Sequence, residues 1–120
     1  MFEFEKLDVY KLAMEFCQDV EGILREIPKT EFALLDQLKR ASLSVPLNIA
    51  EGSGRWHDNE KRQYCFISRG SVFECVALLS LVEMKKLISV DKHARLREKL
   101  KRLAQMLTKL AQSFSRDRDT

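Results

Sequence analysis

The longest helical pattern in the chain is DNEKRQYCFISRGSVFECVALLSLVEMKKL, residues 58–87. Its apolar residues recur at steps of three and four, which predicts an α-helix about 45 Å long. They form two stripes on different sides of the helix. One stripe holds Tyr64, Ile67, Ser71, Cys75, Leu78 and Val82, and the other holds Phe66, Phe73, Ala77 and Leu81. A helix of an isolated four-helix bundle buries one stripe, so the second stripe predicts contact with another copy of the chain.

Three more segments show helical spacing, and short breaks separate them. The predicted helices cover residues 8–27, 31–51, 58–87 and 90–115, and Asp8, Asp58 and Ser89 are the expected caps of the first, third and fourth. The last one places leucines at alternating steps of four and three, which is typical of the seam of a bundle. These seam residues are Leu96, Leu100, Leu103, Leu107, Leu110 and Phe114. Because the breaks are short, consecutive helices must lie antiparallel, and the sequence predicts a single all-α domain, residues 1–120, with up-down-up-down topology.

The second predicted helix has an ambiguous middle. Leu43, Val45, Leu47 and Ile49 alternate along the chain as in a strand. Pro46 also removes a helical donor and crowds the carbonyl of the residue four positions earlier. We interpret this segment as a kinked helix, and a short strand is the alternative.

Composition and cysteine usage restrict the class of protein. The chain has 120 residues, of which 45% are hydrophobic and 32% charged, as in a folded domain and unlike a disordered tail. Its start, MFEFEKLD, is acidic, and no run of about 18 apolar residues exists, so neither export nor membrane spanning is expected. Cys17, Cys65 and Cys75 are odd in number and lack CxxC spacing, which favours a reducing, cytoplasmic location.

Basic residues concentrate in the second half of the chain. Residues 57–120 carry 14 Lys and Arg against 8 Asp and Glu, whereas residues 1–56 carry 7 against 10. A stripe on one side of the fourth predicted helix is a candidate nucleic-acid contact, with Arg97 and Lys101 beside it. Its members are Lys92, Arg95, Lys99, Arg102 and Lys109. A solvated basic face is the alternative, and because no aromatic residue interleaves the stripe, base stacking is not expected.

Residues 40–55, RASLSVPLNIAEGSGR, break several helix rules. Glu51 lies at a predicted helix end, before Gly52 as the expected stop, where the helix dipole disfavours a carboxylate. In the third helix, Arg69 lies among apolar residues and precedes Gly70, which is unfavourable in a helix interior. Close helix packing or an ion pair would explain both features. We therefore expect Glu51, with Asn48 one turn before it, to meet Arg69 or Arg55 where the two helices face each other.

Three segments carry a resemblance to a known family: FEKLDVYKLA (residues 4–13), SVPLNIAEGSGR (residues 44–55) and FISRGSVFE (residues 66–74). From Phe4 to about Leu110, the chain resembles the four-helix bundle proteins encoded by intervening sequences inside bacterial 23S ribosomal RNA genes. The matching positions are Ser44, Pro46, Asn48, Ile49, Ala50, Glu51, Gly52, Gly54, Arg55, Arg69, Gly70, Ser71 and Glu74.

The resemblance implies a left-handed antiparallel bundle, ring-like homopentamers and a non-enzymatic protein without a settled biochemical role. A related branch, the accessory proteins of diversity-generating retroelements, binds nucleic acid and the reverse transcriptase. Trp56 and His57 stand where the family has basic or small polar residues, and Leu47 stands where alanine is common. Because of these departures, the resemblance does not indicate which ligand this chain binds.

Catalytic chemistry finds little support in the sequence. The chain contains no Glu-x-x-His pair, which a di-metal carboxylate bundle requires. His57, Asp58 and Glu60 straddle a predicted helix start, where a capping role for Asp58 is simpler than metal binding. No catalytic residue, cofactor, metal or small-molecule substrate is therefore expected.

These observations predict a non-enzymatic homo-oligomer, a pentamer by the resemblance, with Phe66, Phe73 and Leu81 at its interface and with RNA or DNA as a candidate partner. The alternative is an accessory factor that docks a protein such as a reverse transcriptase through the Trp56 region, without touching nucleic acid.

Overall fold

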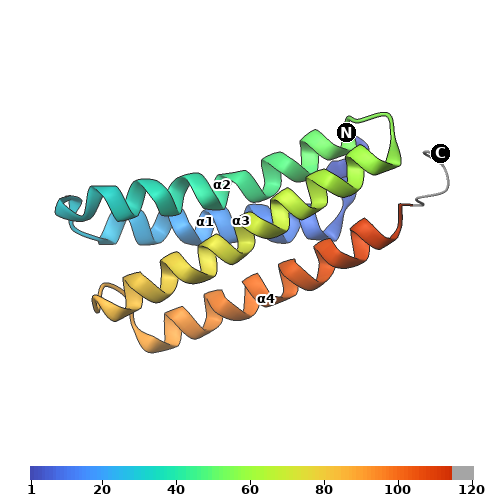
Figure 1. Cartoon of the computed structure of the whole chain (residues 1–120). Helices are drawn as coiled ribbons and strands as arrows, with labels where there is room; N and C mark the ends of the chain where they lie inside the picture. Colours follow the sequence, from blue (N-terminus) through green and yellow to red (C-terminus); the bar gives the residue numbers. More distant parts are fainter. Residues whose placement is uncertain (115–120) are drawn as a thin grey trace.

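Four long helices account for most of residues 1–114, the part of the chain that this computed structural model describes (Figure 1). They are α1 (Asp8–Glu26), α2 (Phe32–Ser53), α3 (Asp58–Met84) and α4 (Val90–Gln112). Two short 3-10 turns, η1 (Glu3–Lys6) and η2 (Lys29–Glu31), precede α1 and α2. The observed helix ends differ from the predicted ones by at most three residues, and residue 115 of the fourth predicted helix lies outside the described part.

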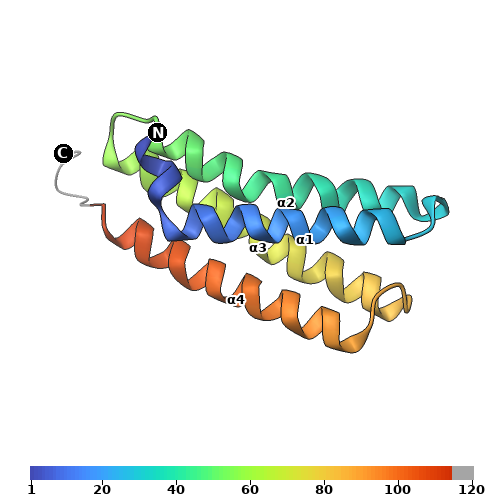
Figure 2. The same cartoon turned by 180° about the vertical axis from the view of Figure 1, so that it is seen from behind.

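Each helix packs against two neighbours: α1 on α2, α2 on α3, α3 on α4, and α4 back on α1. Figures 1 and 2 show this arrangement from opposite sides, with neighbouring helices antiparallel and the N-terminal residues beside the α2–α3 loop. The predicted all-α, up-down-up-down bundle is confirmed.

The core lies between all four helices. Its largest fully buried side chains come from every helix: Phe16 and Ile23 from α1, Leu38 from α2, Leu79 from α3, and Leu100, Leu103 and Leu107 from α4. Most of the leucine seam is therefore buried as expected, while Leu110 and Phe114 at its far end are partly exposed.

The middle of α2 is helical, and the strand alternative is wrong. Pro46 lies inside α2 and is buried. It cannot donate to the carbonyl of Ser42, as a residue in this position normally would. The thiol of Cys17 on α1 donates to that carbonyl instead, at 3.2 Å. A side chain of α1 thus replaces the backbone N–H that proline lacks.

The helix ends correct three expectations and confirm one. Ser89 caps α4, because its hydroxyl accepts from the backbone N–H of Lys92 at 3.1 Å. Asp8 and Asp58 are not caps: each is the first residue of its helix, with no side-chain cap bond from the residue before it. Gly52 does not end α2, which continues to Ser53.

Helix α3 is, among the described helices, the one long and apolar enough to cross a membrane by length and composition. The sequence expectation that no such segment exists was therefore too strict. In this fold, however, α3 packs between α2 and α4, and Val72, Cys75, Leu79 and Val82 are buried in the bundle. The compact bundle uses its most apolar helix as partly buried core.

Candidate functional site

The motif at the end of α2 brings two helices into close contact at Gly52. A Cβ atom added at Gly52 would lie 2.7 Å from the Cβ of Tyr64 on α3, closer than real Cβ contacts. Glycine is therefore required here by the approach of α3, and not by a helix stop. This contact sets the distance between the two helices at the loop end.

Arg55 joins the same two helices through polar contacts. Its guanidinium donates to the Glu51 carboxylate at 2.7 Å and to the Tyr64 hydroxyl at 2.6 Å, and it lies 4.9 Å from the centre of the Tyr64 ring. Tyr64 and Glu51 raise the pKa of the Arg55 guanidinium above its ordinary value. Of the two partners expected for Glu51, Arg55 is correct, and it lies one helical turn away along the chain.

A row of hydroxyl and amide groups links α2 to α3 further along. The Ser44 and Ser71 hydroxyls are 2.7 Å apart, and the Asn48 amide donates to both the hydroxyl and the carbonyl of Ser44 at 2.8 Å. Ser68, which is fully buried, donates to the Val45 carbonyl at 2.9 Å. Asn48 thus supports this row and does not contact Glu51. These motif residues hold the two helices together.

Arg69 and Gly70 have different surroundings from those expected. The Arg69 guanidinium lies 4.6 Å from the centre of the Phe73 ring, and not near Glu51. Gly70 is exposed, and a Cβ added there would meet nothing within 4 Å. Close packing inside this chain therefore does not explain Gly70, and the expectation that it would is wrong. Glu74, another motif residue, is also exposed.

One side of α3 carries a continuous apolar surface, which we call the α3 face: Phe66, Gly70, Ala77, Leu81 and Met84. Phe66 is 54% exposed, Leu81 44% and Met84 64%. Ile67, predicted on the other stripe, is also 44% exposed. Phe73, 53% exposed, lies at the edge of this surface toward α4. The bundle leaves the second stripe of α3 uncovered.

The predicted basic stripe on α4 divides into two groups. Lys99 bonds Asp19 at 2.5 Å and Glu15 at 3.2 Å, both on α1, and Lys92 lies 3.9 Å from Glu26. These two lysines are therefore neutralised by α1, and the expectation of one shared solvent face is wrong for them.

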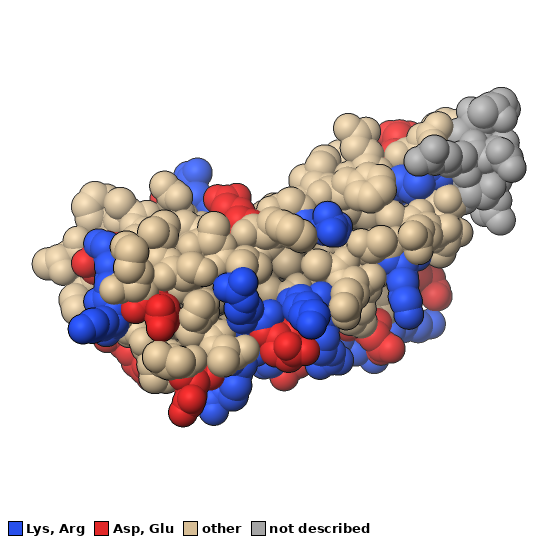
Figure 3. Space-filling view, turned by 60° about the horizontal axis from the view of Figure 1, so that its bottom comes forward, with Lys and Arg blue, Asp and Glu red and all other residues tan. Residues whose placement is uncertain are grey.

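The other basic residues of this α4 stripe and beside it, together with one arginine of α3, have no ion pair with any residue between 1 and 114. They are Arg95, Arg102 and Lys109 from the predicted stripe, Arg97 and Lys101 beside it, and Arg69 from α3. Figure 3 shows basic and acidic side chains side by side in the lower half of the view, beneath a broad band of mostly uncharged residues. This group is the more credible candidate for contact with an anionic partner.

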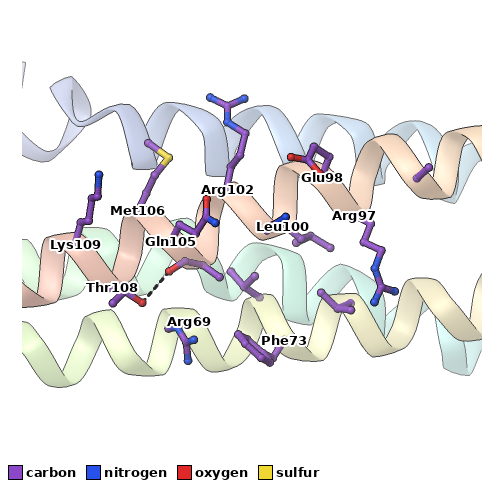
Figure 4. A pocket seen from close by; sticks show the side chains of 15 residues that line it. Arg69, Phe73, Arg97, Glu98, Leu100, Arg102, Gln105, Met106, Thr108 and Lys109 are labelled. Carbon is purple, nitrogen blue, oxygen red and sulfur yellow. Dashed lines mark hydrogen bonds between the residues drawn. The ribbon is translucent and has the colours of Figure 1, made fainter.

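A groove of about 1200 Å³ runs between α3 and α4. Its apolar lining includes Val72, Phe73, Val76, Leu100 and Ala104. Its basic lining comprises Arg69, Arg97, Lys101, Arg102 and Lys109, and Glu98 is the single acid that residues 1–114 contribute to it. In Figure 4, Arg97 points from α4 toward α3, where Arg69 and Phe73 lie on the opposite wall, while Arg102 points away from α3.

The α2–α3 loop presents Trp56, which is 89% exposed. A side chain this exposed is not a packing anchor of the bundle, and the expected role in contacting a partner remains open to it. Its neighbour His57 is exposed as well.

The cysteines and acids do not form a reactive or metal-binding site within residues 1–114. Burial raises the pKa of Cys17 and Cys65 to about 11 and that of Cys75 to about 12, so all three are protonated thiols at neutral pH. No group of three or more His, Cys, Asp and Glu side chains in this part could hold a metal ion.

The family model of the 23S rRNA-intervening sequence proteins matches residues 5–109, which include all four helices except the last three residues of α4. The chain belongs to this family. The resemblance noted from the motifs is therefore confirmed. No curated protein matches the chain.

A solved relative shares the fold. It is a protein with unknown function from the S23 ribosomal protein family of Bacteroides thetaiotaomicron, similar at a TM-score of 0.81 over 86% of this chain and 97% of that one. The two sequences are 16% identical, so this likeness shows the fold alone. The family is uncharacterised, and the comparisons give it no catalytic activity.

Sequence reasoning missed two features of this surface. Arg69 was one of two expected partners of Glu51 on α2, but it lies on the α4 side of α3, where it contributes to the groove. Arg62 is buried and donates to the Phe114 carbonyl at 2.9 Å, which ties the end of α4 to α3. The only sequence signal for either was an arginine within an apolar helix.

Proposed function

We propose that this family member is a non-enzymatic scaffold that assembles into a homo-oligomeric, pentameric ring through the α3 face. The observation that supports this proposal is the exposure of Phe66, Leu81 and Met84 along one side of the most apolar helix. Contact between apolar faces removes this area from water, at about 25 cal/mol per Å². A surface of this kind commonly marks an interface.

Gly70 gives this proposal a second, independent support. A glycine in a helix interior costs up to about 1 kcal/mol relative to alanine. Nothing within residues 1–114 requires it, because a Cβ there would meet no atom of this part within 4 Å. A helix from another copy, packed close against α3 at Gly70, would require it.

The assembly is tested by multi-angle light scattering of the purified protein. We expect a mass five times the 14.0 kDa of one chain. Phe66→Glu should dissociate the oligomer, whereas Phe32→Glu, the matched change at an exposed phenylalanine of α2, should not. A monomeric wild type would refute the assembly, and equal dissociation by both variants would refute the α3 face as its interface.

Gly70→Ala supplies a subtler test with Gly22→Ala as its control. Gly22 on α1 also has nothing within 4 Å. Both changes should favour the helix, but only Gly70→Ala should weaken association, because its methyl group would enter the interface. Unchanged association in Gly70→Ala would remove the support that Gly70 provides.

We further propose that the ring binds nucleic acid electrostatically through the unpaired cations of α3 and α4. Neutralising phosphates releases counterions, so the affinity for RNA or DNA should fall steeply as salt rises. Several copies in one assembly would multiply a weak attraction for each chain. A titration of generic RNA and DNA at increasing salt concentrations tests this. Affinity that is absent or flat with salt would count against it.

Protein docking through Trp56 is the competing function, and the 89% exposure of its indole favours it. In that case Trp56→Ala would abolish binding to a partner such as a reverse transcriptase, while nucleic acid would not bind. The reverse result, with Trp56→Ala neutral and nucleic-acid binding intact, would support the scaffold that binds nucleic acid.

The three cysteines support a location in the reducing cytoplasm. All are free, and Cys65 and Cys75 are buried. Expression of a tagged protein followed by fractionation would test this location, and recovery from the membrane fraction would contradict it.

A further inference from the structure

We propose that the groove between α3 and α4 is a binding site for single-stranded nucleic acid, in which a base stacks at Phe73 while the backbone follows the cations of α4. This inference rests on the nucleic-acid binding proposed above and specifies its site and its strand preference.

The basic residues on the α4 wall of the groove follow the helix axis, an arrangement that suits the phosphates of a nucleic-acid strand. Arg97 and Lys101 are one helical turn apart on α4, about 6 Å along the axis. Lys109 lies eight residues further, about 18 Å along the axis from Arg97, and in Figure 4 it points away from α3 at the rim of the groove. None of the three has an ion pair with a described residue, and Glu98 is the one acid of the lining. These cations are therefore available to phosphates.

The opposite wall supplies a seat for a base. The Phe73 ring is 53% exposed, and the Arg69 guanidinium lies 4.6 Å from its centre. Both an aromatic ring and a guanidinium plane stack on bases. Both residues line the groove, and Figure 4 shows them side by side on α3. Beneath them, Val72, Val76, Leu100 and Ala104 provide apolar contact for an unstacked base.

Arg69 also lacks a hydrogen-bond partner that a ligand could provide. Its Nε atom is buried and makes no hydrogen bond to any residue between 1 and 114. A buried donor without an acceptor is unfavourable, because it has lost its hydrogen bonds to water. A turn of the Arg69 side chain toward a phosphate oxygen or a base carbonyl in the groove would give this donor an acceptor.

These features favour a single strand over a duplex. The bases of a duplex are stacked on one another inside two backbones, so they cannot reach Phe73 or the apolar lining. The cations alone attract both forms. The tertiary structure therefore provides the stacking that the sequence of α4 did not predict, because the aromatic residue comes from α3.

The test measures fluorescence anisotropy of a labelled 20-nucleotide oligo(U) and of an RNA duplex of equal length, using the full chain. Wild type should bind oligo(U) more tightly than the duplex. Phe73→Ala should weaken oligo(U) binding about 5- to 100-fold and leave duplex binding unchanged, since stacking acts on free bases. Lys101→Glu should weaken both ligands.

Two controls separate these effects from general changes in charge and surface. Phe32→Ala removes an exposed phenylalanine from α2, and Lys39→Glu reverses an exposed charge on α2. Neither should change the affinity. If Phe73→Ala does not fold, Phe73→Tyr and Phe73→Leu replace it: tyrosine should retain oligo(U) affinity, and leucine should lose it.

The outcomes distinguish the two proposals. Salt-dependent binding with equal affinity for both ligands, and no effect of Phe73→Ala, would overturn the groove but leave electrostatic binding intact. No binding of either ligand would overturn both proposals. An acidic peptide such as oligo-glutamate that displaces oligo(U) from wild type, with higher affinity and equal sensitivity to Phe73→Ala, would assign the groove to a protein partner and overturn this inference.

Discussion

The thiol of Cys17 lies 3.2 Å from the carbonyl oxygen of Ser42, the acceptor that Pro46 leaves without its helical donor. Helix α2 therefore tolerates an interior proline because α1 supplies a hydrogen bond from outside the helix. Burial raises the pKa of Cys17 to about 11, so the thiol remains a donor at physiological pH. The proline of the family motif is thus coupled to a residue on another helix.

Cys17→Val should lower the free energy of unfolding by about 1–2 kcal/mol, because the Ser42 carbonyl loses its partner. In a Pro46→Ala background, the alanine N–H can donate to this carbonyl. Cys17→Val should therefore lower the free energy of unfolding by less in that background. Urea unfolding of the four proteins in this double-mutant cycle measures the coupling. Equal costs in the two backgrounds would show that Cys17 does not compensate for Pro46.

Gly52→Ala should lower the free energy of unfolding by about 1–3 kcal/mol, since its methyl group would overlap the Tyr64 Cβ. Gly54→Ala is the matched control in the same motif, because its nearest neighbour would be 3.6 Å away. It should be neutral or slightly stabilising. Thermal unfolding of both variants measures the difference, and similar melting temperatures would contradict the close approach at Gly52.

Lys99→Glu and Lys101→Glu should separate structural cations from ligand-binding ones. The first change places a carboxylate beside Asp19 and Glu15 and should cost about 1–2 kcal/mol of stability. Lys101 has no ion pair with a described residue, so its reversal should change stability by less than about 0.5 kcal/mol. Chemical unfolding compares them, and equal losses would argue against the division of the basic residues.

Lys86→Gly should raise the free energy of unfolding by roughly 0.5–1 kcal/mol. Lys86 has a φ of 60° and follows the end of α3, where its N–H bonds Glu83 and the next N–H bonds Val82. This left-handed position normally favours glycine. Lys85→Gly, one residue earlier with a φ of −79°, is the control and should not stabilise. A destabilised Lys86→Gly variant in thermal unfolding would contradict this account.

Stability should decline as the pH rises above about 9. Burial raises the pKa of Cys65 to about 11 and that of Cys75 to about 12, from an ordinary value of 9.0. Between these values the unfolded chain loses thiol protons that the folded chain retains, so unfolding becomes easier by up to about 1.4 kcal/mol per pH unit for each thiol.

Urea unfolding between pH 8 and 10 measures this slope. A Cys65→Ala/Cys75→Ala variant should show a shallower slope, although it starts from a lower stability. An unchanged slope would mean that these thiols do not govern the decline.

Features that depend on residues close in the chain could be predicted from the sequence. Helical periodicity indicated four helices and most of the α4 seam, the short breaks indicated antiparallel neighbours, and Ser89 was correctly placed as a cap. Arg55, one of the two partners expected for Glu51, could be proposed for the same reason, since it is four residues away. In each case the relevant geometry repeats within one or two turns of a helix.

Contacts between helices required the tertiary structure. Periodicity indicated two apolar stripes on α3 and assigned Phe66, Phe73 and Leu81 to the exposed one, but Ile67 of the other stripe is also exposed. The pairing of Lys99 with Asp19, 80 residues away, and the position of Arg69 beside α4 depend on the rotation and register of whole helices. Packing of the complete core sets these quantities, so no local stretch of the chain encodes them.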